Sequence, residues 1–556
     1  MMTKTRGVTQ QLPQIQNIGF RSPKVNVLIL FPKTTRTFGW KANHPGFALV
    51  LGETPFPVKS RQQAAAFHHP FVETTMHLPH LRRAAVGVLS ATLLLTLATI
   101  PAPAQPDYQL HAAPVAATSA DPAIAGALTQ ISADHIHQTI QTLVGFGTRN
   151  TLSSMETDLP PGQGITAAAD WIFAQFQAIS KDCGGCLEVK RDTFTNPVAE
   201  RIPKPTTLTN VYAILRGSAP DSDPAQAKRM YLVTGHYDSR NTDVLDAHGA
   251  APGANDDASG VAVSLECARV LSKLKLSATL VFVAVAGEEQ GLNGSAHLAK
   301  LAKDEGWQLE GVLNNDIVGG NTTPPASPNE ETLQRKDTVR VFSEGIPATA
   351  TPEQERRIRN LGLADDAPSR QLARSMADAA RTYTTGFAPF LVARPDRYLR
   401  GGDHTSFNRE GFAAVRLTEW REDFNHQHQN VRVENGVQYG DLLPFVDFAY
   451  VASVARLNAA TLATLAASPG TPQEVKFDMH GLNNGSTLTW KAADGAPKDI
   501  HYEILWRETT APDWQYSFIV SSASPATATL PISKDNVIFG IRAVDSKGHR
   551  SLVATP

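Results

Sequence analysis

Short apolar runs alternate with helix-like segments through the middle of the chain. Runs typical of buried strands cover 208–215 (LTNVYAIL), 229–236 (RMYLVTGH), 279–287 (TLVFVAVAG) and 311–316 (GVLNND). Helical periodicity follows them, as in 260–274 (GVAVSLECARVLSKL) and 294–303 (GSAHLAKLAK). Buried strands that alternate with helices indicate an α/β sheet covered by helices on both faces.

The α/β pattern extends in both directions from this centre. Helical periodicity also covers 131–180 and 352–382, and a further strand-like run covers 413–419. A long apolar helix is predicted at 440–466, where the pattern ends. We therefore predict one α/β domain over 131–467.

The composition changes after this domain. A Pro- and Gly-containing linker at 468–473 is followed by 474–556, which contains only short alternating β runs. About 85 residues with this spacing suit a seven-stranded, all-β sandwich. The segment resembles a fibronectin type III module, with Trp490 in an early strand.

A stretch well inside the chain has the order of a secretory signal. Residues 76–83 (MHLPHLRR) are basic, 84–100 form an uncharged apolar run of seventeen residues, and 102–104 (APA) match a cleavage site. This order predicts a signal peptide over 76–104 that starts at Met76, and hence a secreted or periplasmic protein. The alternative is a membrane anchor, because seventeen residues lie at the lower edge for a span.

This interpretation also assigns the residues on either side of the predicted signal peptide. Residues 1–75 are then an upstream mis-start or an extension, and the Ala-, Pro- and Ser-rich residues 105–130 form a flexible lead-in. After signal cleavage we expect no stable membrane insertion. The formal net charge is −2, which gives no support for a nucleic-acid partner, since that would require a concentrated basic surface.

The chain has only three cysteines, so it is not a disulfide scaffold. Cys183 and Cys186 form a CxxC pair, for which a small-loop disulfide is the simplest interpretation in an oxidising compartment. Cys267 lies in an apolar helical pattern and is expected to be a buried packing residue.

Histidine and carboxylate side chains occur where the predicted strands end. His236 and Asp238 stand at the carboxyl end of a predicted strand, where open α/β sheets bind ligands. Residues two positions apart in an extended segment share a face, so Asp238 could hold the second ring nitrogen of a metal-bound His236. Asp256 and Asp257 precede a helix, where a cap requires only one of them.

Further candidates follow the next predicted strands. Glu288 and Glu289 are adjacent at a strand end, an arrangement that is costly unless positive charge lies nearby. A metal cluster would account for both, with one as ligand and the other handling protons. Asp316, His426 and His428 complete an inventory of oxygen and nitrogen ligands that suits a two-metal hydrolytic site. Without thiolates, Zn²⁺ is favoured, with Mn²⁺ or Co²⁺ as substitutes.

The order of these motifs resembles peptidase family M28, the zinc peptidases of the bacterial aminopeptidase type. The resemblance covers roughly 130–465 and rests on HYDS, PGANDDASG, AGEEQGLNGS, NND and a late histidine. It implies a three-layer α/β/α zinc-exopeptidase-like domain with a mixed, mostly parallel sheet.

The resemblance also implies two zinc ions and a role for each residue. Asp256 bridges the two ions, Glu288 is the general base and acid, and Asp238 orients a histidine ligand. The implied metal ligands are His236, Asp256, Glu289, Asp316 and His428. The last ligand is expected 20–30 residues after GGDHTSF at 401–407, a window that contains both His426 and His428, and His428 is preferred.

Other polar residues fit less directly. Arg400 and Arg416 could bind a substrate carboxylate, although surface or structural roles are favoured. The resemblance places His404 in the wall of the substrate pocket, and a structural loop role is an equal alternative. His248 and His297 are expected to be a loop and a helix-face histidine.

The implied reaction is hydrolysis by a metal-activated water, with Glu288 moving the proton. We therefore predict a secreted aminopeptidase that acts on peptide or protein substrates. The alternatives are a carboxypeptidase or dipeptidase of the same family, and a non-catalytic binding protein. Glu288 argues against the binding protein, because a scaffold that only holds metal needs no base. A glutaminyl cyclase uses one zinc, whereas five ligand positions are filled here.

Overall fold

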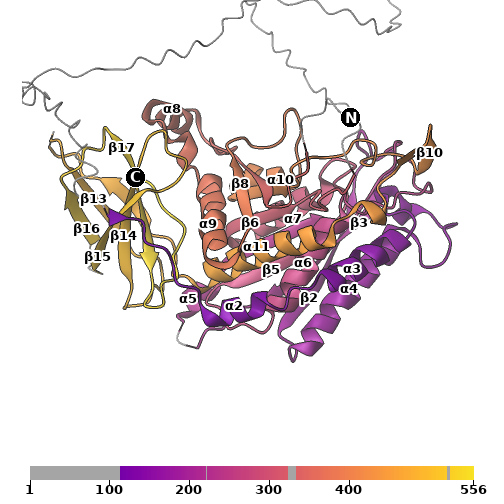
Figure 1. Cartoon of the computed structure of the whole chain (residues 1–556), viewed down its shortest axis with the longest axis horizontal. Helices are drawn as coiled ribbons and strands as arrows, with labels where there is room; N and C mark the ends of the chain where they lie inside the picture. The colour runs from indigo at the N-terminus through magenta and orange to yellow at the C-terminus, as the bar shows by residue number, and fades with distance from the viewer. Residues whose placement is uncertain (1–112, 221, 324–332, 482, 522–525) are drawn as a thin grey trace, which may run out of the picture. The chain divides into compact units, whose positions relative to one another are not determined.

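The computed structural model describes 113–220, 222–323, 333–481, 483–521 and 526–556, all within one compact unit, Thr99–Pro556 (Figure 1). The predictions for residues 1–75, the signal peptide and residues 105–112 lie outside the described residues.

An eight-stranded sheet forms the centre of the described α/β part, in the order β2-β3-β5-β4-β6-β9-β7-β8. Strand β4 pairs in parallel with β5 and β6, β6 with β9, and β7 with β8, whereas β2–β3, β3–β5 and β7–β9 are antiparallel. The predicted mixed, mostly parallel sheet is thus confirmed. The strands are β2 Leu187–Asn196, β3 Thr206–Leu215, β4 Arg229–His236, β5 Thr279–Val285, β6 Gln308–Asn315, β7 Thr338–Ser343, β8 Ala388–Val392 and β9 Ala414–Thr418.

Helices cover both faces of this sheet and give it three layers (Figure 1). Alternate residues of each strand point to opposite cores: Tyr231 and Val233 pack with α6 and α11, while Leu232 packs with Leu298 of α7 and Phe407 of α10. The helices are α2 Pro122–Leu128, α3 Ala133–Gly145, α4 Gly164–Asp182, α5 Pro224–Ala227, α6 Ala258–Leu271, α7 Asn293–Asp304, α8 Pro352–Leu361, α9 Pro368–Tyr383, α10 His404–Arg409 and α11 Phe448–Ala467.

Helix α11 is the one described helix that is long and apolar enough to cross a membrane. Most of its apolar stretch is buried against α3, α6 and α9, so it belongs to the core of the α/β part. The apolar run that predicted this helix therefore reflects burial within the protein.

Three strands of the sheet were not predicted. Strand β2 is an edge strand in which buried or half-buried positions alternate with exposed charged ones, and β7 and β8 lie toward the opposite edge. Such strands lack the continuous apolar run that marks a central parallel strand. A small hairpin of β10 Arg432–Glu434 and β11 Val437–Tyr439 stands apart from the sheet.

The C-terminal region is an all-β sandwich, as predicted. One sheet has the order β12-β13-β16 and the other β1-β15-β14-β17, with Trp490, Trp506 and Phe539 in the core between them. The strands are β1 Ala113–Pro114, β12 Gln473–Phe477, β13 Ser486–Lys491, β14 His501–Glu508, β15 Tyr516–Ser521, β16 Ala526–Leu530 and β17 Val537–Val544.

The lead-in and the linker differ from the predictions. Residues 113–114 form strand β1 on the edge of the sandwich, and helix α2 buries Ile124 and Leu128, so the described part of 105–130 is not a flexible lead-in. The predicted linker begins with the buried Ser468, whose carbonyl oxygen accepts a hydrogen bond of 2.8 Å from Arg229. Backbone pairing and tertiary burial, which local composition does not report, fix both segments.

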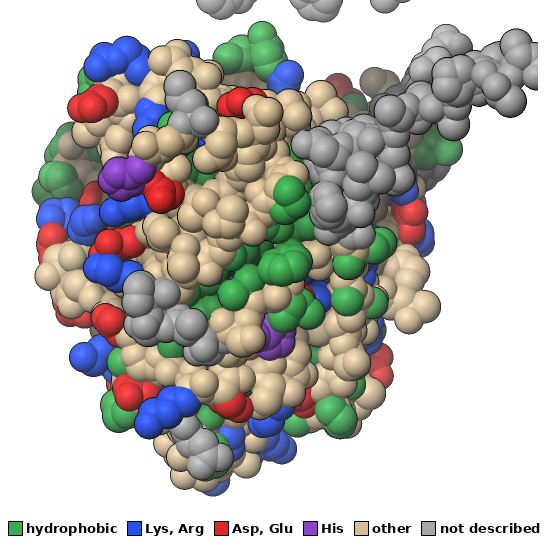
Figure 2. Space-filling model, turned by 90° about the vertical axis from the view of Figure 1, so that its left-hand side faces the viewer, with side chains coloured by type: hydrophobic (Ala, Val, Ile, Leu, Met, Phe, Trp, Pro, Cys, Tyr) green, Lys and Arg blue, Asp and Glu red, His purple; other side chains and the backbone are tan. Residues whose placement is uncertain are grey.

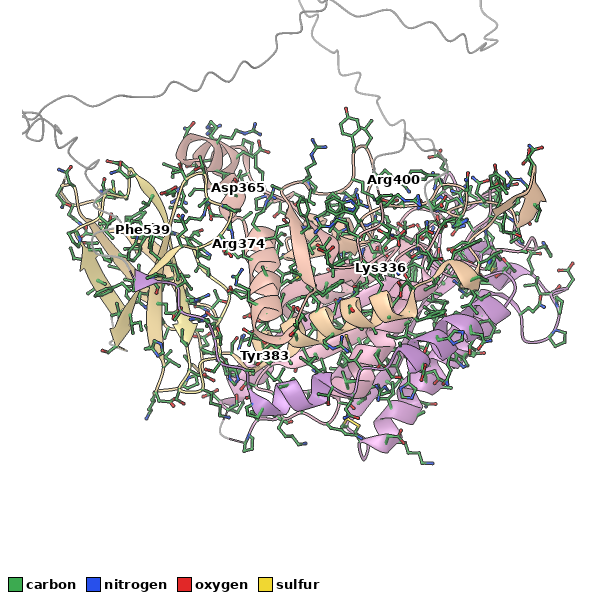
Figure 3. The ribbon with its side chains drawn as sticks, viewed as in Figure 1. Lys336, Asp365, Arg374, Tyr383, Arg400 and Phe539 are labelled. Carbon is green, nitrogen blue, oxygen red and sulfur yellow. A yellow bond between two sulfur atoms is a disulfide. The ribbon has the colours of Figure 1, made fainter. Side chains whose placement is uncertain are left out.

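The sandwich packs on the α/β part through a buried ionic joint. Asp366, at the end of the short η2 helix Leu363–Asp366, contacts Arg374 of α9 at 3.1 Å and Arg507 of β14 at 2.6 Å. Figure 3 shows Arg374 on the side of α9 toward the sandwich. Beside the joint, the indole nitrogen of Trp514 donates to Gln371 at 3.2 Å. One buried carboxylate thus lies between two guanidinium groups.

The sandwich also has an outer apolar surface. Figure 2 views the molecule from the side that carries the sandwich, and hydrophobic side chains gather around a hollow at the centre of that face. Among the described residues, Met479, Phe518 and Ile519 are exposed apolar residues of the sandwich.

The structure contains a disulfide between Cys183 and Cys186, just after α4, as the sequence predicts. Cys267 is buried in α6, also as predicted.

Candidate metal centre

The residues singled out from the sequence meet at one edge of the sheet. His236 ends β4, Glu288 and Glu289 follow β5, and Asp316 follows β6. These three strands are parallel neighbours, so their carboxyl ends lie side by side. Asp256 comes from the loop that leads into α6.

Six side chains, which together form the cluster, fall into two groups of potential metal ligands. His236, Glu288 and Asp316 offer ligand atoms that all lie within 4.8 Å of one another, and the same holds for Asp256, Glu289 and His428. Asp256 lies between the groups: its Oδ1 is 3.1 Å from Nε2 of His236 and its Oδ2 is 3.0 Å from Nε2 of His428.

The two histidines near residue 427 point to different places. Nε2 of His428 lies 3.1 Å from Oε1 of Glu289, whereas His426 stacks on Phe445 with ring centroids 3.8 Å apart. His428 also has a positive φ of 55°, an uncommon conformation for a residue with a side chain. The structure therefore brings His428, rather than His426, to the cluster.

Two further carboxylates hold the backbone around Asp256. Asp257, joined to Asp256 by a cis peptide bond, accepts hydrogen bonds from the N–H groups of His236, Gly260 and Ile317. It thereby ties β4, α6 and the end of β6 together, and its bond to Gly260 is the predicted helix cap.

Asp441 acts on the residues just before that cap. Its carboxylate accepts from the N–H of Asn255 at 2.9 Å and from the N–H of Asp256 at 2.7 Å. With Asp257 it fixes the loop that carries the central carboxylate.

Asp238 contributes mainly through the backbone of the neighbouring glutamates. Its two carboxylate oxygens accept from the N–H groups of Glu288 at 3.2 Å and Glu289 at 3.1 Å. The nearest Asp238 oxygen to Nδ1 of His236 is the main-chain one at 3.1 Å, with the carboxylate at 3.5 Å. Asp238 thus contacts His236, as predicted, and it also fixes the backbone of both glutamates.

The cluster holds more negative charge than its own cations balance. Burial and the neighbouring Asp316 and Glu289 raise the pKa of Glu288 well above its usual value. Although burial opposes the charged form of His428, contacts with Glu289 and Asp256 raise its pKa to about 10. Both shifts follow from the crowding of carboxylates in this buried site.

The donor set fits divalent zinc. It consists of imidazole nitrogens and carboxylate oxygens without a thiolate, and each group spans no more than 4.8 Å between ligand atoms. Oε1 of Glu289 is buried and has no hydrogen-bond donor among the described residues, even though His428 lies beside it. A cation between these atoms would satisfy all of them.

Other candidates from the sequence have structural partners. His404 is buried, its Nε2 lies 2.8 Å from the carbonyl oxygen of Pro395, and burial lowers its pKa to about 4. His297 stacks on Phe194 and pairs with Asp192 at 3.0 Å.

The two arginines considered for a substrate carboxylate differ in exposure. Arg416 is fully buried and contacts Asp316, so it cannot reach a substrate. Arg400 is partly exposed, 3.8 Å from Glu422, and Figure 3 shows it near β8 and α10.

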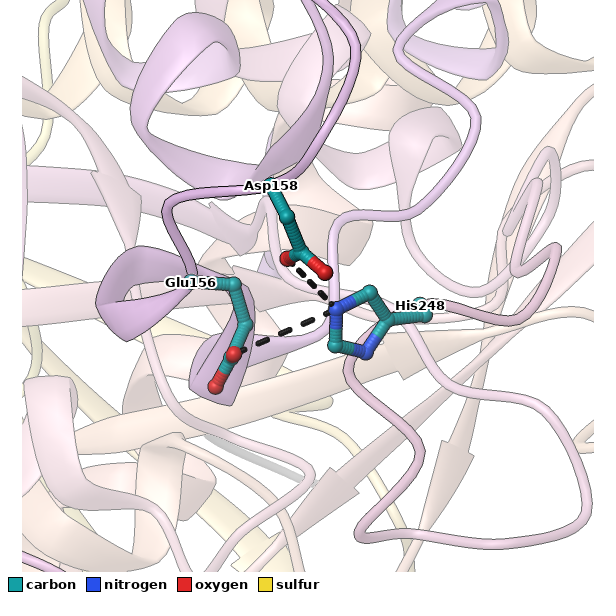
Figure 4. A group of neighbouring side chains, drawn as sticks. All are labelled: Glu156, Asp158 and His248. Carbon is teal, nitrogen blue, oxygen red and sulfur yellow. Dashed lines mark hydrogen bonds and ion pairs between the residues drawn. The ribbon is translucent and has the colours of Figure 1, made fainter.

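A third group of potential ligands lies outside the cluster. Figure 4 shows Glu156, Asp158 and His248, with Nε2 of His248 at 2.9 Å from Asp158 and 3.9 Å from Glu156. Glu156 also pairs with Lys204 at 3.1 Å. The group is largely solvent-exposed and these ion pairs account for it without a metal.

Sequence reasoning missed Asp441 and the contact of Arg416 with Asp316. Asp441 follows Asp256 by 185 positions and belongs to no recognisable motif. For Arg416 the sequence favours a surface or structural role over a substrate contact, but it does not identify Asp316 as the partner. Neither residue carries a local signal, because the partner of each comes from a distant part of the chain.

Comparisons with known proteins identify a peptidase family. Residues 210–434 match the model of peptidase family M28. A probable zinc metalloprotease of Leptosphaeria maculans is 42% identical over 427 residues, which cover 77% of this chain and 95% of that protein. A probable zinc metalloprotease of Pyricularia oryzae is 42% identical over 489 residues, with 87% of this chain and 93% of that protein covered. The LapA aminopeptidase of Legionella pneumophila is a more distant structural match: TM-score 0.41, 19% identity, with 62% of this chain and 73% of that chain covered.

Proposed function

The chain belongs to peptidase family M28, and from this membership we propose that it is a secreted zinc aminopeptidase with a two-ion centre. The relatives named as zinc metalloproteases support zinc and peptide-bond hydrolysis. The two ions, the preference for amino termini and the export are inferences from the residues of this chain.

The observation that carries the proposal is the position of Asp256 between two ligand groups. One group contains His236 and Asp316, the other Glu289 and His428, and each Asp256 oxygen faces one of the two histidines. If each group held one ion, a carboxylate so placed could serve both, as two-metal hydrolytic sites require.

When bound, the zinc ions would acidify a water molecule and polarise the scissile carbonyl. Glu288 lies beside His236 and Asp316, where it can accept the proton that the attacking water loses. Glu288 can then hold that proton and pass it to the leaving amine. Asp238 keeps Glu288 in place through its backbone N–H.

The charge of the centre favours a substrate with a free amino terminus. The site concentrates carboxylates, which attract an α-ammonium group. Arg416, which could have favoured a carboxypeptidase, is buried and engaged with Asp316 and Gly401. We therefore favour the aminopeptidase over a carboxypeptidase or dipeptidase.

The proposed export rests on the signal-like order of residues 76–104. The disulfide between Cys183 and Cys186 is consistent with an oxidising compartment. The C-terminal sandwich has the strand spacing of a fibronectin type III module, and we propose that it braces the peptidase through the Asp366 joint.

A matched substrate panel tests the proposal. Purified protein would be assayed with peptides that differ only in whether the amino terminus is free, N-acetylated, or free with an amidated carboxyl terminus. We expect cleavage of both free-amine peptides and none of the acetylated one. Cleavage that requires a free carboxyl terminus would instead show a carboxypeptidase, and no cleavage of any peptide would favour the binding protein.

A further inference from the structure

Arg416 is the one described arginine or lysine that pairs with a carboxylate of the six-residue cluster. It lies on β9, is fully buried, and places Nη2 at 2.8 Å from Oδ1 of Asp316. Asp256 instead faces two histidines and Gln427, whose Nε2 lies 3.0 Å from its Oδ2, and Glu289 faces His428. Arg149, also buried nearby, donates to carbonyl oxygens only.

The opposite side of the same guanidinium binds a loop. Nη1 donates to the carbonyl oxygen of Gly401 at 2.8 Å and to Asp396 at 3.3 Å. These contacts anchor both ends of the segment 396–401, so the arginine connects a proposed zinc ligand directly to this loop.

Gly402 shows how tightly this connection is built. A Cβ atom at position 402 would lie 2.6 Å from Nη1 of Arg416 and 3.3 Å from Oδ2 of Asp316. Only a residue without a side chain lets the backbone pass so close to both groups. The second glycine of the GGD sequence is thereby explained.

The tip of the loop is open to solvent. Tyr398 is 77% exposed and Leu399 90% exposed, and Leu399 has a positive φ of 58°. The anchors are buried instead: Asp396 contacts Arg397, which in turn lies 2.6 Å from Glu422. The loop therefore combines a rigid base beside the cluster with an exposed apolar tip.

We propose that Arg416 is a positioning residue that holds Asp316 in its ligand orientation and fixes the 396–401 loop to it. A guanidinium suits this task because its planar fork can engage several acceptors at once, which an ammonium cannot do. The loop leads into Asp403, at the start of α10, so the entry to this helix is tied to the metal centre through one side chain. The inference rests on the proposed two-ion function, since it gives Asp316 a zinc to bind.

The test compares three variants of the full chain with the wild type. Zinc affinity is measured by competition with a chromophoric chelator, and loop order by the rate of chymotrypsin cleavage after Tyr398, identified by mass spectrometry. For Arg416→Gln we expect about tenfold weaker binding of one zinc ion, as for other supporting contacts of metal ligands, together with faster cleavage.

The other two variants separate the two halves of the role. Arg416→Lys keeps a positive charge, so zinc affinity should stay within about threefold while cleavage remains fast, because the ammonium cannot bridge all acceptors. Asp396→Asn leaves the guanidinium on Asp316, so zinc affinity should hold and only cleavage should accelerate. These two carry the test if Arg416→Gln does not fold.

Arg340→Gln is the matched control. Arg340 lies on the adjacent strand β7 and binds Glu422 and the carbonyl oxygen of Glu419, without contact to the cluster. Because Glu422 also binds Arg397 of the loop, this control is read on zinc affinity alone, which should stay unchanged.

Two outcomes would overturn the proposal for Arg416. One is unchanged zinc affinity and loop cleavage in the folded Arg416 variants, and the other is tighter zinc binding, which would mean that the arginine only repels the metal. Fewer than two zinc ions in the wild type would instead defeat the proposed function itself.

Discussion

Two buried regions of the molecule handle carboxylate charge in opposite ways. At the joint with the sandwich, Asp366 lies between Arg374 and Arg507, with each guanidinium within 3.1 Å. In the cluster, four carboxylates share one direct guanidinium contact and two histidines: Asp256, Glu288, Glu289 and Asp316. The joint is balanced by the chain itself, whereas the cluster is balanced only when cations are added.

This difference separates structural from functional burial of charge. A buried carboxylate that is paired and hydrogen-bonded fixes one arrangement of the chain, and removing one partner is strongly destabilising. Carboxylates left without cations raise the pKa values of their neighbours, as for Glu288 and His428. Four predictions use this contrast.

The largest effect is expected from the proposed proton carrier. Glu288→Gln should lower kcat about 10²–10⁴-fold, because general acid–base transfer is lost while the ligand set is kept. Zinc content should be unchanged, in contrast to Glu289→Gln, which removes a ligand charge. Kinetics with an amino-acid p-nitroanilide and metal analysis of both variants check this, and near wild-type turnover of Glu288→Gln would refute the assigned base.

A substitution at the Asp366 joint should change the stability of the protein rather than its activity. Asp366→Asn should lower the free energy of unfolding by about 3–5 kcal/mol, because two buried guanidinium groups lose their counter-charge. Turnover of the folded fraction and zinc content should remain. Denaturant unfolding checks this, with Asp365→Asn, at the exposed neighbouring residue, as the matched control. Equal stability of the two variants would mean that the sandwich is not braced at this joint.

The two nearby histidines provide a smaller and sharper contrast. His428→Ala should weaken the binding of one zinc ion by at least about tenfold, because His428 faces Asp256 and Glu289. His426→Ala removes a ring that stacks on Phe445 and should leave zinc affinity close to the wild type. Chelator competition measures both, and the reverse order would move the ligand to His426.

The smallest effect is a pH dependence of stabilisation by zinc. The pKa of His428 is raised to about 10 in the metal-free protein, so this group stabilises the fold fully below its unfolded pKa and loses that contribution as pH rises through about 10. Zinc must displace this proton, so its affinity falls as pH falls. The rise in Tm on adding zinc should therefore be larger at pH 8 than at pH 6. An equal rise at both pH values would contradict protonation of the empty cluster.

Much of the fold was predictable because central strands carry their own signal. The predicted run at 229–236 coincides with β4, and the run at 279–287 contains β5. Strand β2 was missed because it is an edge strand with exposed charged positions. Strand β1 could not be found from composition, since it exists only through its pairing with β15.

The residues of the candidate site likewise divide into those that the sequence predicts and those that it does not. Its six central residues follow parallel strands or recognisable motifs, so their order in the sequence predicts that they meet. Asp441 and Arg416 act through partners far away in the sequence, and neither has a motif of its own. The joint is equally non-local, because Asp366 and Arg507 are 141 positions apart.

The central claim is that the cluster is completed by two zinc ions. It is tested most directly by measuring zinc per chain and peptidase turnover together during stepwise chelation and zinc return. We predict two zinc ions per active chain, loss of turnover as they are removed, and recovery when zinc is restored. Full turnover after exhaustive chelation would contradict the account.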